Sequence, residues 1–440
     1  MLASLVVSAA LLVSAAAVAD DEPMPLTLAD ALAMAGRANP DLRATRERSQ
    51  AAQARGAAEG RALWPRLSGA SEWARTDTPA RVFASKLNRG QFAAEDFAID
   101  RLNDPAPLSH LVTSILLEAP LDVFGTTRAQ ARSAAAEGRA SAALVDEAAQ
   151  ELRLRVVEAY RHLVLARVAE GATARALEGA KAREADIEAQ TSEGIALEAD
   201  RLRARARRRQ READVAERQS ELRMAQATLR RLLGAAVAIS FEATEPAPAP
   251  SPLAADVGAW AARAVAARGA LQAARERLES ARWAERAERR SRLPDVSAYG
   301  QLQDDRGSLS DARTSGSLGI VLRWNVLDAS RGKRVAAAAA EARASAEESR
   351  AAEDQVRLEV ETAFQRAETA RERYAAAAGG AAEGREALRV IQERRQAGRA
   401  TLTDELETEA ASLAAELEEM RVAAEAAIAD AALRRAAGEL

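Results

Sequence analysis

The chain has no cysteine and only two histidines, His110 and His162. Without thiols it can form no disulfide, thiolate metal site or lipidated N-terminal cysteine. Two histidines are too few for a histidine-based metal or catalytic cluster, and His162 lies in an apolar helical stretch where packing is expected. No glycine-rich phosphate loop or nucleophile–base–acid set is present. We therefore expect no metal, no cofactor and no enzymatic activity.

Aromatic residues and net charge are also scarce. Aromatic residues make up 3% of the chain, whereas 48% is hydrophobic, and much of that is alanine, which suits close helix–helix contacts better than a globular core. The net charge of −4 is small. A nucleic-acid-binding protein needs a basic surplus on one face, so nucleic acid is not an expected partner.

Long apolar runs are missing except at the N-terminus. Residues 2–19 are apolar and end in Ala17-Val18-Ala19, followed by Asp20. This order predicts a secretory signal peptide over residues 1–19, with an N-terminal membrane anchor as the alternative. No other stretch approaches the roughly 18 to 20 apolar residues of a spanning helix. We expect an exported protein.

The chain does have the same plan twice, in a first repeat over 20–243 and a second over 253–440, joined by a Pro-rich linker at 244–252. Each repeat has a helix of nearly forty residues, two β runs, a helix of more than sixty, a glycine turn and another helix of nearly forty. The predicted helices are 27–63, 126–190, 197–233, 253–291, 333–395 and 401–437. The predicted strands are 66–75, 109–119, 295–303 and 314–325.

The predicted helix lengths exclude a compact globule. A helix of more than sixty residues is about 95 Å long at 1.5 Å per residue. The two shorter helices of each repeat, stacked end to end, match that length. We therefore expect lateral packing in a coiled-coil arrangement. A solvated coiled coil would explain the helices alone.

The β runs require another explanation. Leu318, Ile320, Leu322 and Trp324 alternate with small or polar residues, as in a strand with lipid on one side and water on the other. Two separated hairpins give four strands, which cannot close a barrel, and open edges cannot exist in lipid. Several chains would have to share one barrel. The alternative is a small soluble β layer that caps a helical stalk.

Four motifs in order give the chain a resemblance to a known family. They are residues 26–42 (LTLADALAMAGRANPDL), 120–125 (PLDVFG), 324–328 (WNVLD) and 397–406 (AGRATLTDEL). Over essentially its whole mature length the chain resembles the TolC-like outer-membrane efflux channels. The resemblance implies a mainly α protein with a membrane β-barrel. In such a protein, three chains give four strands each to a twelve-stranded barrel, above a long α-helical barrel in the periplasm.

The resemblance also implies function and partners. A homotrimer in outer-membrane lipid would conduct substrates passively, with a periplasmic adaptor (membrane fusion) protein and an inner-membrane pump of the RND, ABC or a similar class. Drug efflux, metal efflux and protein secretion all remain open. The alternative from another class is a structural coiled-coil protein of the periplasm, a spacer or adaptor without channel activity.

The expected periplasmic mouth lies at the turns of Gly194 and Gly398, where glycine supplies a positive φ. By resemblance, Asp404 and Glu407 fall on acidic ring positions, which would concentrate cations at a narrow opening. The alternative is that both are surface acids near a helix N-terminus. The resemblance also implies that these turns, with Thr401 beside the second, contact the adaptor.

The first repeat differs at this place. Asp200 matches Asp404, but Arg203 replaces the second acid. Arg395 and Arg399 flank the second turn, and we expect them to hold the mouth shut through ion pairs with Asp404, Glu405 or Glu407.

Overall fold

The structure is a computed structural model that describes residues 24–236, 240–253, 255–307 and 312–440. The predicted signal peptide therefore lies outside the described residues. The chain divides into two compact units, and each takes segments from both repeats. Unit 1 consists of Met1–Arg43, Ala148–Ala264 and Glu359–Leu440, and unit 2 of Ala44–Glu147 and Val265–Leu358.

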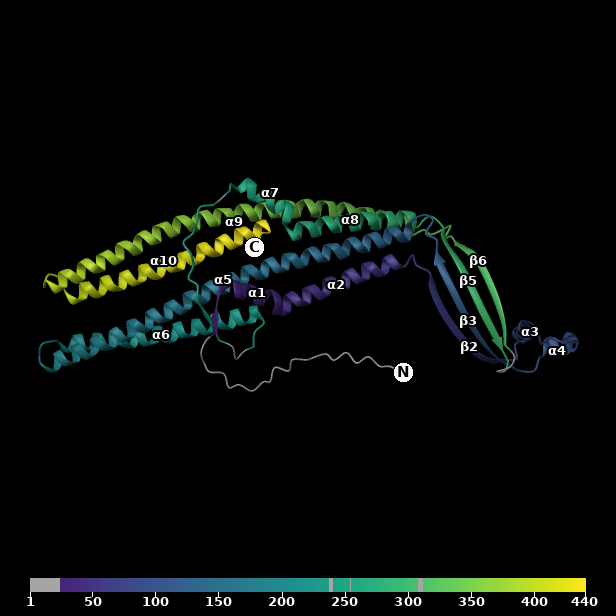
Figure 1. The fold of residues 1–440 in the computed structure, drawn as a ribbon, viewed down its shortest axis with the longest axis horizontal. Coiled ribbons are helices and arrows are strands. Elements are labelled where there is room, and N and C mark those ends of the chain that lie inside the picture. Colours follow the sequence, from purple (N-terminus) through teal and green to yellow (C-terminus); the bar gives the residue numbers. More distant parts are fainter. Residues whose placement is uncertain (1–23, 237–239, 254, 308–311) are drawn as a thin grey trace, which may run out of the picture. The chain divides into compact units, whose positions relative to one another are not determined.

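Eight helices of the described chain correspond to the six predicted ones (Figure 1). They are α1 (Leu28–Ala38), α2 (Pro40–Arg61), α5 (Thr126–Ser192), α6 (Glu198–Leu233), α7 (Val257–Ala267), α8 (Gly269–Arg290), α9 (Arg331–Gln396) and α10 (Leu402–Ala437). The four predictions for the long helices and their partners are confirmed. Within the described residues, no helix combines the length and the apolar character needed to cross a bilayer.

The first predicted helix is wrong as a continuous element, because it breaks between α1 and α2. Pro40 has no N–H to donate and begins α2, a position that suits proline. The side chain of Asn39 caps the new helix, because its Oδ1 accepts from the Leu42 N–H at 2.9 Å. Its Nδ2 donates to the carbonyl of Leu232 at 2.9 Å. This buried asparagine fixes the break against α6.

The matching helix of the second repeat breaks at Arg268, between α7 and α8. The Arg268 side chain is buried and pairs with Glu147 at 3.0 Å (Nη2 to Oε1). Glu147 also accepts from the backbone N–H of Ala270 at 3.2 Å. The carboxylate of α5 thus serves as the cap that α8 lacks in its own sequence. The prediction of one helix over 253–291 missed this break.

Unit 2 contains one four-stranded antiparallel sheet in the order β2-β3-β5-β6. The strands are β2 (Arg66–Thr76), β3 (Leu108–Pro120), β5 (Asp295–Arg306) and β6 (Ala312–Arg323), so the four predicted strands are confirmed within a few residues. The two hairpins are not separate, because β3 pairs with β5, as in Leu117 opposite Gly300. The strands lie side by side in Figure 1. The outer strands β2 and β6 each have one edge that pairs with no described strand.

Several short elements escaped the sequence analysis. In unit 1, β1 (Met24–Leu26) pairs in parallel with β4 (Phe241–Ala243). Three residues are too few for a periodic signal, but Leu26 and Phe241 are buried, and the Tyr160 hydroxyl donates to the Leu26 carbonyl at 2.9 Å. The connection between β2 and β3 holds α3 (Pro79–Asn88), the 3₁₀ turn η1 (Ala94–Phe97) and α4 (Ile99–Asn103).

Small residues let the helices of unit 2 approach closely. Ala140, Ala143 and Ala273 form a buried cluster. A Cβ placed on Gly269 would lie 2.4 Å from the Ala143 carbonyl oxygen, and one placed on Gly56 would lie 2.9 Å from the Ala134 carbonyl oxygen. These backbones are in direct contact, so the alanine-rich composition is used for tight lateral packing.

We predict that Gly269→Ala destabilises the protein by about 1 to 3 kcal/mol, because the added methyl must displace the backbone of α5. The matched control is Gly179→Ala in α5, where an added Cβ meets nothing within 4 Å. Alanine there should stabilise the helix by about 0.5 to 1 kcal/mol. Thermal unfolding followed by circular dichroism measures both. Equal midpoints for the two variants would contradict the packing argument.

Candidate functional site

Unit 1 contains two helical hairpins, and each ends in a helix–turn–helix tip. Tip 1 joins α5 to α6 through Gly194 (φ 78°), and tip 2 joins α9 to α10 through Gly398 (φ 70°). Both glycines have a left-handed backbone, which other residues adopt with strain. A Cβ on either glycine would meet nothing within 4 Å. The requirement for glycine is therefore conformational and not steric.

The two tips end their long helices with the same hydrogen bonds. In each, the glycine N–H and the next N–H bond back to carbonyls of the last helical turn, the Schellman arrangement. The distances are 3.1 Å (Gly194 N to Thr191 O), 2.8 Å (Ile195 N to Gln190 O), 2.9 Å (Gly398 N to Arg395 O) and 2.8 Å (Arg399 N to Arg394 O). The duplication thus includes the left-handed glycine and this pair of hydrogen bonds at each tip.

Tip 2 continues into a capping box formed by Thr401 and Asp404. The Thr401 Oγ1 accepts from the Asp404 N–H at 3.2 Å, and the Asp404 carboxylate accepts from the Thr401 N–H at 2.9 Å and hydroxyl at 2.6 Å. The hydroxyl and the backbone N–H of Thr401 lower the pKa of Asp404 below its ordinary value. Asp404 therefore has a local structural role at the start of α10 and stays ionised.

The other residues predicted at tip 2 lie nearby. Glu407 is exposed one turn beyond Asp404, with no ion pair in the described part of the chain. Arg395 pairs with Glu405, so it joins α9 to α10 within one hairpin. Arg399 is exposed and has no ion pair among the described residues. Of the three acids expected to hold the arginines, the structure brings only Glu405 to Arg395.

Tip 1 repeats the geometry without the capping box. Leu197 occupies the N-cap of α6 and offers no side-chain hydrogen bond. Asp200, which matches Asp404, instead pairs with Arg203 of its own helix at 3.3 Å (Oδ1 to Nη1). The two aspartates therefore share a position but have different partners.

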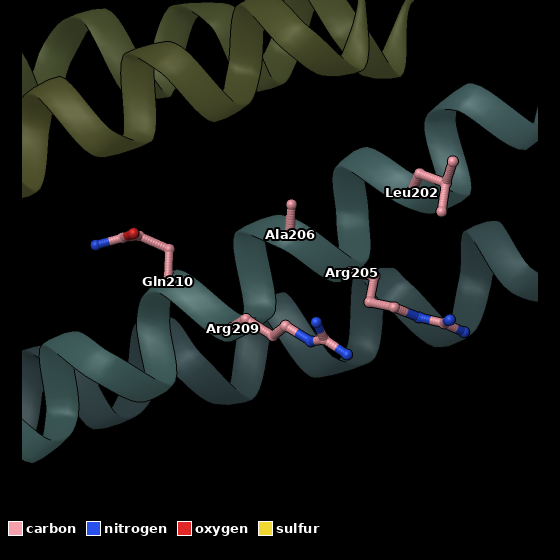
Figure 2. Close-up of a pocket in the computed structure, with 5 residues that line it drawn as sticks. All are labelled: Leu202, Arg205, Ala206, Arg209 and Gln210. Atoms are coloured by element: carbon pink, nitrogen blue, oxygen red, sulfur yellow. The ribbon is translucent and has the colours of Figure 1, made fainter.

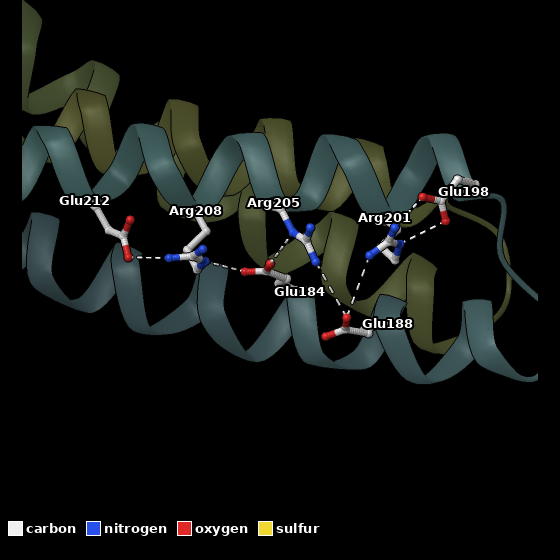
Figure 3. A network of polar contacts seen from close by, with 7 residues as sticks. All are labelled: Glu184, Glu188, Glu198, Arg201, Arg205, Arg208 and Glu212. Atoms are coloured by element: carbon white, nitrogen blue, oxygen red, sulfur yellow. Dashed lines mark hydrogen bonds and ion pairs between the residues drawn. The ribbon is translucent and has the colours of Figure 1, made fainter.

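A network of ion pairs, missed by the sequence analysis, joins α5 to α6 behind tip 1 (Figure 3). Glu184 pairs with Arg205 at 3.4 Å and with Arg208, and Glu188 pairs with Arg205 at 3.7 Å and Arg201 at 3.9 Å. Hydrogen bonding to Arg201 also lowers the pKa of Glu198. The sequence signal was the arginine run 201–211 together with regularly spaced acids on the preceding helix. It predicts these ion pairs only when the register of the hairpin is known.

The predicted lipid-facing residues are exposed on one face of β6. Leu318, Ile320 and Leu322 are 87%, 71% and 60% exposed. Trp324 is 54% exposed but lies one residue beyond the end of the strand, where its Nε1–H donates to the Arg292 carbonyl at 3.0 Å. Such an apolar exposed face is typical of an interaction with lipid or another apolar surface.

No group of three or more metal-ligating side chains suited to a metal ion occurs among the described residues. His110 is buried on β3, whereas His162 is exposed on α5. His162 is therefore not packed in the core of the single chain, whereas the other expectation for it, a position at a helix interface, stays a prediction. The apolar face of α5 runs through Val156, Tyr160 and Leu163, and His162 points away from it.

Comparison with known proteins identifies this architecture. The sequence profile of the family described as "Outer membrane efflux protein" matches residues 31–235 and 260–439. No curated protein matches the chain in sequence. Solved structures do, and three of them are outer membrane proteins described as the Campylobacter jejuni CmeC channel, Vibrio cholerae VceC and the open state of the Neisseria gonorrhoeae MtrE channel.

These three structures share the fold at low sequence identity. CmeC has a TM-score of 0.79 and 17% identity, with 94% of this chain and 85% of CmeC covered. VceC has a TM-score of 0.74 and 18% identity, with 93% and 96% covered. MtrE has a TM-score of 0.71 and 19% identity, with 93% and 88% covered. The similarity spans both repeats of the chain.

We predict that Thr401→Ala raises the hydrogen-exchange rate of the first-turn amides of α10 by about fivefold, the usual cost of a lost N-cap. Leu197→Thr should do the reverse in α6, because it would create the same box with Asp200. The pKa of Asp404 is lowered, so its contribution is complete above the ordinary aspartate pKa of 3.8 and is lost as the pH falls through the lowered value. Exchange that is insensitive to both substitutions would contradict the capping role.

Proposed function

Because the chain belongs to the outer membrane efflux protein family, we propose that it is the outer-membrane channel subunit of a tripartite efflux or type I secretion system. The observation that carries this proposal is the four-stranded sheet with unpaired edges at β2 and β6 and an apolar exposed face on β6. Unpaired strand edges are not tolerated in lipid. A barrel that closes by sharing strands among subunits removes them.

Three subunits would give a barrel of twelve strands, four from each chain, in the outer membrane. The long helices α5 and α9 and their shorter partners would form the helical tunnel in the periplasm. Residues 1–19 would direct export and be removed, and the two repeats 20–243 and 253–440, joined by the linker 244–252, would form pseudo-equivalent walls. Conduction would be passive, with the energy supplied by an inner-membrane pump of the RND, ABC or a similar class.

The two tips would form the periplasmic opening and contact a periplasmic adaptor protein. Their supporting feature is the repeated left-handed turn at Gly194 and Gly398, followed at tip 2 by Thr401. Two rigid tips per subunit present six identical backbone turns in a trimer. Co-purification of an adaptor with the wild-type trimer, and its loss from a trimer in which both turns are deleted, tests this contact.

Asp404 and Glu407 of three subunits would place six carboxylates around the opening. The capping box supports this role, because it holds Asp404 ionised and fixes the direction of the first turn of α10. A ring of ionised carboxylates raises the local concentration of cations and repels anions. Tip 1 has Arg203 where tip 2 has Glu407, so the ring would be built by the second repeat alone.

We predict that the purified protein runs as a trimer in detergent and conducts ions in planar bilayers with a preference for cations. Glu407→Gln should move the ratio of cation to anion permeability toward equality without changing the trimer mass. The control is Glu348→Gln, an exposed acid of α9 away from the tip. A monomeric protein that inserts no conducting channels would favour the alternative, a structural coiled-coil protein of the periplasm.

Arg395 would act as a latch at tip 2, since its pair with Glu405 holds α9 against α10. An exposed ion pair stabilises by at most about 1 kcal/mol, so the latch shifts an equilibrium and does not lock it. We predict that Arg395→Glu raises the single-channel conductance and that Arg395→Glu combined with Glu405→Arg restores it. Arg399→Glu, at an arginine without an ion pair in the described chain, is the comparison. Unchanged conductance in the Arg395→Glu variant would contradict the role of Arg395 as a latch.

A further inference from the structure

The helices of the two hairpins in unit 1 follow one another in the order α9, α10, α5, α6 (Figure 1). Ion pairs connect each neighbouring pair: Arg373 with Glu425 at 3.0 Å joins α9 to α10, and Arg205 with Glu184 at 3.4 Å joins α5 to α6. The central contact, α10 with α5, joins the two repeats. Among the described residues, one face of α9 and one face of the part of α6 nearer its tip have no helix beside them, whereas α1 packs against the other end of α6.

The central contact is held by polar pairs along its length. Arg183 of α5 pairs with Glu409 of α10 at 3.4 Å near the tips. Farther from the tips, Glu151 pairs with Arg435 at 3.2 Å, and the Gln150 side chain donates to the Gly438 carbonyl at 3.0 Å. The contact thus joins a long helix of the first repeat to a short helix of the second.

The duplication predicts the counterpart of this contact. The long helix of the second repeat is α9 and the short helix of the first is α6, and within the chain these two lie at opposite ends. In a closed ring of subunits, α9 of one subunit meets α6 of the next. We propose that this junction repeats the α5–α10 contact, with a basic face of α6 against an acidic face of α9 in a second copy of the chain. The proposal rests on the ring assembly put forward above.

The pair of Arg183 with Glu409 within the chain gives the register expected at the junction, without using the charges of the junction itself. When the repeats are aligned at Gly194 and Gly398, Arg183 falls on Ala387 of α9 and Glu409 falls on Arg205 of α6. One turn farther from the tips, Glu383 of α9 comes opposite Arg209 of α6. Both side chains are exposed, and neither has an ion pair in the described part of the chain.

The same register matches the two faces over the turns nearest the tips. Moving along the helices from the tips, it brings together an apolar pair, an opposite-charge pair and a pair of alanines: Leu202 with Val390, Arg209 with Glu383 and Ala216 with Ala376. Leu202 is 54% exposed in the single chain, although it is apolar. The alanine pair allows the close approach that the helices of unit 2 also use.

The charges on the two faces have opposite signs overall. On α6, the exposed arginines Arg209, Arg223 and Arg231 have no ion pair among the described residues, and on α9 the same is true of four exposed acids. These acids are Glu361, Glu368, Glu372 and Glu383. A shallow groove on this face of α6 is lined by Leu202, Arg205, Ala206, Arg209 and Gln210 (Figure 2). Opposite charges on facing helices select the partner and the register.

Cysteine cross-linking tests the junction directly, because the natural chain has no cysteine. The full chain carrying Ala216→Cys and Ala376→Cys should give disulfide-linked dimers and trimers on a denaturing, non-reducing gel. The matched control is Ala206→Cys with Ala411→Cys, which places the cysteines on α6 and α10 at similar distances from the two tips. It should give no disulfide-linked dimers or trimers. Links within one chain, or links only in the control, would overturn the proposal.

Charge exchange gives a second measurement. Arg209→Glu and Glu383→Arg should each lower the fraction of trimer that survives mild heating in detergent by about two- to fivefold, the range for one exposed ion pair. The double variant, which has the net charge of the natural chain, should recover it. No recovery would contradict the pairing.

Measurements of the mass and conductance of the natural chain distinguish a failure of this junction from a failure of the proposed function. A conducting trimer in which Ala216→Cys and Ala376→Cys do not link would overturn this junction and leave the channel intact. A chain that neither forms trimers nor conducts would overturn the proposed function itself.

Discussion

Close lateral packing of long helices is the constraint on which the rest of the structure depends. α5 and α9 have 67 and 66 residues, and α6 and α10 have 36 each, so the two repeats are matched almost residue for residue. At 1.5 Å per residue the long helices reach about 100 Å. Elements of this length can bury their apolar stripes only against each other, side by side. Alanine and glycine at the contacts let the backbones approach each other closely, as at Gly269 against the Ala143 carbonyl.

That packing decides where glycine, proline and buried charge are used. Two of the shorter predicted helices are broken, and each break is fixed by a polar side chain from a neighbour or from the break itself. Asn39 binds the Leu232 carbonyl, and Glu147 receives Arg268 and the N–H of Ala270. A buried ion pair or amide contributes little net stability, but removing one partner leaves the other unsatisfied. These residues therefore specify the position of each bend.

The sequence predicted the architecture well because its signals were long and repeated. The predicted helices 126–190, 197–233, 333–395 and 401–437, the four strands, the positive-φ glycines at 194 and 398 and the exposed apolar face of β6 all agree with the structure. The break at Arg268 was missed because its cap comes from Glu147, far away in the sequence. The break at Asn39 has a local cap and a following proline, a signal that the sequence analysis did not use. The pairing of β3 with β5, the short strands β1 and β4 and the ion pairs of Glu184 depend on which segments meet, and periodicity carries no such information.

The candidate site was predictable in its positions but not in its contacts. Asp404 lies at the tip, where it was expected, but its side chain bonds to the nearby Thr401. The S/T-x-x-D spacing predicts this bond only if the start of the helix is placed correctly. Arg395 has a partner, Glu405, inside its own hairpin. Whether a carboxylate caps a helix or faces an opening is decided by the side-chain rotamer and by neighbouring subunits. The structure of a single chain shows the side-chain rotamer, whereas the sequence shows neither the rotamer nor the neighbouring subunits.

The differences between the repeats carry more functional information than their similarity. Two identical repeats would present the same surface on α6 and α10, and nothing would distinguish a contact within a subunit from one between subunits. The backbone has kept the symmetry, as the matching Schellman turns show, while the charges have diverged: α6 begins with the arginine run 201–211, and the first half of α10 is acidic. Opposite charges favour one order of helices around a ring, and like charges disfavour the others. In the proposed ring, a duplicated chain would gain a defined closure from side chains alone, without a change in fold.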